Sequence, residues 1–148
     1  MNHAQSVDHY LRRCAELIGL RDWSIKFDPK PVEEPEEDDT QAMTNSTEDC
    51  TASVRFAPQF WSFCPKEQRA VIAHELCHLH TNRLRVLAEH FVTGYPKRAR
   101  GVLNLTLEEA DEHVVESIAR LLTPMLPLPH FSKPSKRKRR LATSISEK

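Results

Sequence analysis

Apolar residues recur at helical spacing near the start of the chain. The apolar positions are Val7, Tyr10, Leu11, Cys14, Leu17 and Ile18. Residues three, four and seven apart lie on one face of a helix, so this spacing predicts an amphipathic helix over residues 6–18. Ser6 is a suitable N-cap for this helix, and Gly19 a suitable stop.

Two short segments then alternate apolar with polar residues, which is typical of half-buried strands. They cover residues 23–27 and 52–56, and we expect them to pair in a short antiparallel sheet. The intervening residues 28–50 are rich in proline and carry an acidic run from Glu33 to Asp39. A segment with so few apolar side chains cannot offset the entropy of ordering it, so we expect a mobile acidic insertion here.

Two further helices are predicted in the second half of the chain. Pro65 suits the first turn of a helix that extends to about Val92, where Gly94-Tyr95-Pro96 interrupts the pattern. A basic loop follows, and Thr106 with Glu109 forms a capping box that predicts a last helix from there to about Leu122. The apolar stripe of this helix is expected to comprise Ala110, Val114, Ile118 and Leu121.

Charge is distributed unevenly over the 148 residues. The chain has 21 basic and 21 acidic residues, but six basic side chains lie between Lys133 and Arg140. We therefore expect one domain over residues 1–131 and a disordered basic tail over 132–148, whose 133–140 segment is a candidate for weak contact with nucleic acid. No apolar run approaches the length of about 18 residues that crosses a bilayer, and the N-terminus does not resemble a secretory signal. These features predict no membrane partner and a cytoplasmic location.

The most informative segment is His74-Glu75-Leu76-Cys77-His78, an HExxH pattern within the second predicted helix. Histidines four residues apart project from one helix face, where both can bind one zinc ion. The intervening glutamate lies beside the metal, where it can act as a general base toward water. The pattern therefore predicts His74 and His78 as metal ligands and Glu75 as the catalytic residue.

A catalytic zinc ion commonly has three protein ligands, and the last predicted helix supplies the candidates for the third. These are Glu108, Glu109, Asp111, Glu112, His113 and Glu116. His80 and His90 do not follow the spacing of a third histidine ligand. Cys77 lies off the ligand face and is expected to be packed, and the four cysteines show no CxxC pair, so we expect them to be reduced.

The sequence HELCHLH, followed about thirty residues later by the segment from Glu112 to Pro124, resembles the zincin-like metallopeptidases that use a glutamate as third ligand. It is most similar to the ImmA/IrrE-like group and to the short zincin-like peptidases encoded by phages. The likeness covers roughly residues 20–125. Glu116 stands where that group has Asn or Asp, and the proline falls one residue early, so Glu108 and Glu109 stay open as ligands.

The resemblance implies a minimal zincin-like α+β domain, in which the sheet packs on the HExxH helix and a C-terminal helix carries the third ligand. It implies one Zn²⁺ per chain held by His74, His78 and Glu112, with Glu116 orienting a ligand histidine. It also implies hydrolysis of a peptide or protein substrate, which would add as a strand beside residues 52–56. Tyr95 and His113 are candidates for stabilising the oxyanion.

A second function stays open at this point. The metal could instead hold two helices together in a non-catalytic regulatory protein that contacts nucleic acid or a partner protein through the basic tail. A closed shell of four ligands would favour this alternative, whereas an open position favours the enzyme.

Overall fold

The structure is a computed structural model that describes residues 2–30, 32 and 41–131. Its elements are α1 (His3–Leu17), β1 (Ser24–Phe27), β2 (Ala42–Ser46), β3 (Thr51–Phe56), α2 (Pro65–Thr93) and α3 (Lys97–Leu122), with short 3₁₀ helices at Pro58–Ser62 and Thr123–Met125. The predicted α+β class is confirmed. None of the described helices combines the length and apolar character of a membrane-spanning segment. The acidic run and the basic tail lie outside the described residues.

The sheet is mixed rather than antiparallel throughout. Its strand order is β1-β3-β2, with β1 parallel and β2 antiparallel to β3. The expected pairing of the 23–27 and 52–56 segments is therefore confirmed, but its direction was predicted wrongly. Strand β2 also corrects the prediction of an unstructured insertion over the whole of residues 28–50, because Ala42–Ser46 pairs along β3.

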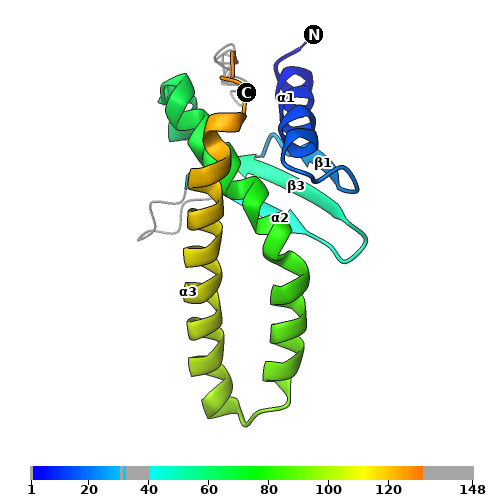
Figure 1. The fold of residues 1–148 in the computed structure, drawn as a ribbon, viewed down its shortest axis with the longest axis vertical. Coiled ribbons are helices and arrows are strands. Elements are labelled where there is room, and N and C mark those ends of the chain that lie inside the picture. The colour runs from blue at the N-terminus through cyan, green and yellow to red at the C-terminus, as the bar shows by residue number, and fades with distance from the viewer. Residues whose placement is uncertain (1, 31, 33–40, 132–148) are drawn as a thin grey trace, which may run out of the picture.

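Helices α1 and α2 cover one face of this sheet (Figure 1). The inward side chains of the central strand, Ala52, Val54 and Phe56, are buried in one core with residues of both helices. The same alternation leaves Ser53 and Arg55 on the other, more exposed face. The site described below is built on the covered face, where β2 runs beside α2.

Helix boundaries differ from the predicted ones at two places. Helix α1 begins at His3, because the Asn2 side chain accepts a hydrogen bond from the Gln5 N–H and the Gln5 side chain accepts one from the Asn2 N–H. Gly19 follows its end with a positive φ of 85°, as expected of a helix stop. Helix α3 begins directly after Pro96, so Thr106 is not an N-cap; its hydroxyl donates to the Val102 carbonyl inside the helix.

Helix α3 packs on α2 through a face other than the predicted one. Its buried side chains are Val115 and Ala119, which form a small second core with Cys77 of α2. Val114 and Leu121 of the predicted apolar stripe are exposed, at 48 % and 76 %. Because Val115 and Ala119 pack on Cys77, the face beside the predicted apolar stripe is the one turned toward α2. The same orientation of the helix directs the carboxylates of Asp111, Glu112 and Glu116 toward α2.

Candidate metal centre

The two histidines lie near the middle of α2, whose start is fixed by Pro65 in the first turn and by Glu67, which accepts a hydrogen bond of 2.8 Å from the Cys64 N–H. Ile72 and Leu76 are buried in the main core, so the opposite side of the helix faces α3. His74 and His78 project from that side, with ring centroids 4.9 Å apart and about a quarter of each side chain exposed.

Helix α3 places Glu112 across both imidazoles. Its Oε2 lies 3.4 Å from His74 Nε2, and its Oε1 lies 3.4 Å from His78 Nε2. Two ligands about 2.1 Å from a tetrahedral ion lie about 3.4 Å apart, so each imidazole nitrogen lies at a suitable distance from one oxygen of this carboxylate. The three residues each offer a ligand atom within 4.8 Å of the others and could hold a metal ion.

The second nitrogen of each histidine also faces a carboxylate of α3. Glu116 Oε2 lies 3.4 Å from His74 Nδ1, and Asp111 Oδ2 lies 3.5 Å from His78 Nδ1. A hydrogen bond of 2.8 Å from Arg120 Nε holds Glu116 and lowers the pKa of its carboxyl. Carboxylates in these positions fix the ring orientation and keep each Nε2 available for a metal.

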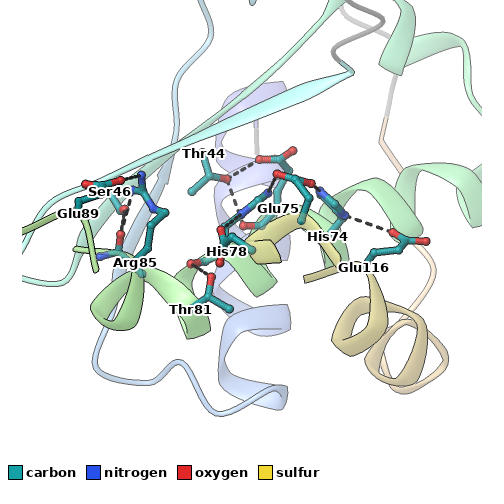
Figure 2. A network of polar contacts seen from close by, with 12 residues as sticks. Thr44, Ser46, His74, Glu75, His78, Thr81, Arg85, Glu89 and Glu116 are labelled. Atoms are coloured by element: carbon teal, nitrogen blue, oxygen red, sulfur yellow. Dashed lines mark hydrogen bonds and ion pairs between the residues drawn. The ribbon is translucent and has the colours of Figure 1, made fainter. Parts of the chain in front are cut away.

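Glu75 turns away from the two histidines and toward the sheet (Figure 2). Its side chain is buried, with only 7 % of the residue exposed, and Oε2 accepts a hydrogen bond of 2.7 Å from the Thr44 hydroxyl of β2. Burial raises the pKa of this carboxyl, while the Thr44 hydrogen bond and the two histidines act in the opposite direction. A carboxyl group with a raised pKa beside a cation-binding cluster is suited to accept and return a proton.

These side chains lie along an open cleft of about 840 Å³ between β2, α2 and α3. The strand that borders this cleft is β2, which contributes residues such as Met43 and Thr44. The expectation that residues 52–56 form the edge strand beside the site is wrong, because β3 is the central strand and pairs on both sides.

The structure brings together His74, His78 and Glu112, the three residues expected to hold the metal. Glu108 lines the cleft one turn away, but neither it nor Glu109 belongs to the group that could hold an ion. The oxyanion candidates Tyr95 and His113 do not line the cleft.

Two residues of the site were not assigned roles from the sequence. Asp111 was one of several acidic candidates, and only the packing of α3 shows that it faces His78. Thr44 lies in a strand that was not predicted, and no sequence signal marked it.

Comparisons with protein-family models, curated protein sequences and solved structures found no match for this chain. The functional argument therefore depends on the geometry of the cleft and on the chemistry of the side chains that line it.

Proposed function

We propose that the protein is a zinc-dependent peptidase that hydrolyses peptide bonds in an extended peptide or protein segment. One observation carries this proposal. His74, His78 and Glu112 converge on a common point, while Glu75 stays outside this group and is buried beside it in an open cleft.

The donor set favours zinc over the alkaline earth ions. Two imidazole nitrogens and one carboxylate oxygen form a common set of protein ligands for catalytic zinc, whereas Mg²⁺ and Ca²⁺ prefer oxygen ligands alone. A bound zinc ion would polarise the scissile carbonyl and make water a stronger acid.

The chain's own residues supply the remaining functions. Glu75 takes a proton from the attacking water and returns it to the nitrogen of the leaving amine. Asp111 and Glu116 hold the imidazoles in position. No strand of the described residues pairs with the outer edge of β2. This edge can pair with the backbone of an extended peptide, which suits a protein substrate and places little demand on its sequence.

The arrangement of ligands supports an enzyme over the regulatory alternative. A purely structural zinc site is usually closed by four protein ligands. In the described part of the chain the group has three, and the nearby carboxylates of Asp111 and Glu116 face the Nδ1 atoms rather than the common point.

The test compares the wild-type chain with Glu75→Gln and with the control Glu109→Gln, which makes the same change on an exposed residue outside the cleft. We expect one zinc per chain in all three proteins by elemental analysis. Cleavage of fluorescently labelled casein and of a mixture of quenched peptides should be abolished only in Glu75→Gln. Zinc-loaded wild-type protein that cleaves none of these substrates would contradict the proposal.

A further inference from the structure

The open edge of the sheet and the buried carboxylate of the site meet at one residue, Thr44. The Ala57 N–H donates to the Gln41 carbonyl and the Thr47 N–H donates to the Thr51 carbonyl, each at 2.9 Å. Directly opposed residues in an antiparallel pair alternate between bonded and non-bonded, so Met43 and Asn45 use their backbone groups toward β3. The N–H and C=O of Thr44 therefore point to the outer edge of β2, which no other described strand pairs with.

The side chain of Thr44 points in another direction, toward α2. Its hydroxyl donates to Glu75 Oε2 at 2.7 Å and lies 3.3 Å from the Glu75 carbonyl oxygen. A hydroxyl has one proton to donate, and the shorter contact to the carboxylate is the stronger of the two. Among the described residues, Thr44 provides the hydrogen bond that fixes this carboxylate, as the close-up in Figure 2 shows.

We infer that Thr44 is a positioning residue that couples a peptide paired along β2 to the carboxylate of Glu75. The inference rests on the hydrolytic function proposed above. Thr44 holds the peptide through its backbone and holds the Glu75 carboxylate through its hydroxyl. One residue therefore sets the position of the scissile bond relative to the catalytic base. The backbone of Thr44 then contributes to substrate binding, and its hydroxyl contributes to the rate of the chemical step.

The two contributions can be separated because a side-chain substitution leaves the backbone in place. Thr44→Val keeps the β-branched shape and removes the hydroxyl, whereas Thr44→Ser keeps the hydroxyl and removes a methyl group. Thr51→Val is a matched control, since Thr51 lies in the neighbouring strand and its hydroxyl contacts Asp49 and Thr47 rather than the cleft.

In peptide cleavage by the zinc-loaded proteins, we expect kcat of Thr44→Val to fall by about 10-fold to 100-fold while KM stays within about twofold, as for a misplaced catalytic group. Thr44→Ser should recover most of the lost rate, and Thr51→Val should resemble the wild type. Equal losses in Thr44→Val and Thr44→Ser, or an effect of Thr44→Val confined to KM, would overturn the inference.

A binding measurement tests the same claim without turnover. A tripeptide hydroxamate can bind zinc through its two oxygens and donate a hydrogen bond to Glu75. We expect calorimetry to show binding about tenfold weaker to zinc-loaded Thr44→Val than to wild type, the cost of one charge-assisted hydrogen bond. Thr44→Ser should bind like the wild type.

The two measurements distinguish the two ways of failing. If the wild type cleaves no substrate but the hydroxamate affinities follow this order, the hydrolytic function is wrong, and only the positioning of Glu75 by the Thr44 hydroxyl is supported. If the wild type cleaves peptides and Thr44→Val matches it in both rate and hydroxamate affinity, the inference about Thr44 is wrong and the function stands.

Discussion

Each imidazole of the site has its two nitrogens in different surroundings. Nε2 of both histidines faces Glu112, and Nδ1 faces either Glu116 or Asp111. One helix thus supplies both the candidate third ligand and the carboxylates that orient the other two. We therefore expect the third ligand, Glu112, to contribute more to metal affinity than the orienting carboxylates of Asp111 and Glu116.

We predict that Glu112→Gln weakens zinc binding by more than about 100-fold, because a ligand is lost. Asp111→Asn and Glu116→Gln should each weaken it by about 10-fold to 100-fold, the usual effect of losing a partner of a ligand histidine. Competition with a chromophoric chelator measures all three affinities. Glu108→Gln and Glu109→Gln are the controls, and a larger loss in either of them than in Glu112→Gln would reassign the third ligand.

The sequence predicted the residues of the site that follow a fixed spacing. The HExxH pattern identified three of them, because residues four apart on any helix share a face. The resemblance of the later segment pointed to Glu112. Asp111 and Thr44 could not be assigned, because their roles depend on how α3 and β2 pack against α2, which spacing along the chain does not determine.

At the scale of elements, the residue at which α3 begins decides whether the basic stretch before Thr106 is a loop or part of the helix. Thr106 and Glu109 have the spacing of a capping box, but Thr106 lies within a helix that extends back to Lys97. The basic residues in this stretch suggested a loop. Packing against α2, where Leu103 and Leu107 are half-buried, extends the helix through them.

We predict that Asn2→Ala lowers the free energy of unfolding by about 1 kcal/mol, because it removes the N-cap of α1. Thr106→Ala should change it by less than about 0.5 kcal/mol, since alanine is the better residue inside a helix. Urea denaturation of both variants measures the two values. A loss of about 1 kcal/mol in Thr106→Ala would instead indicate an N-cap at this position.

Strand β2 was missed for a reason connected with the site. Its inward positions after Ala42 are occupied by Thr44 and Ser46, whose hydroxyls bond to Glu75 and Asn82 of α2. Polar residues at inward positions remove the apolar alternation by which a strand is identified from sequence. The direction of the β1 and β3 pairing also left no local signal, because it depends on the course of the chain between them.

At the scale of the whole molecule, the candidate metal ligands come from two helices that are anchored differently. Helix α2 belongs to the main core with α1 and the sheet, whereas the buried residues of α3, Val115 and Ala119, form a small core with Cys77, and only its last residue, Leu122, also packs on the main core. The carboxylates that α3 places along the histidines repel one another unless a cation is present. Metal binding should therefore strengthen the attachment of α3 more than that of the main core.

We predict that zinc at a hundredfold excess over its dissociation constant stabilises the fold by about 2.7 kcal/mol, and that a chelator removes this contribution. Hydrogen exchange should then become faster in α3 than in α1. Glu112→Gln is the control, and with binding at least 100-fold weaker it should gain no more than about 0.4 kcal/mol at the same zinc concentration. Equal loss of protection in both helices would show that the two cores unfold as one unit.

The far end of the α2 and α3 pair extends beyond the sheet (Figure 1), and side chains such as Leu87, Phe91 and Leu105 are exposed there. Seven residues make nearly two full turns of a helix, so removing seven from each arm changes the facing side chains by only about 20°. The length of this projection can therefore change by seven residues in each helix without turning the Glu112 carboxylate away from the histidines. A single-residue deletion in one arm, by contrast, rotates everything after it by about 100°.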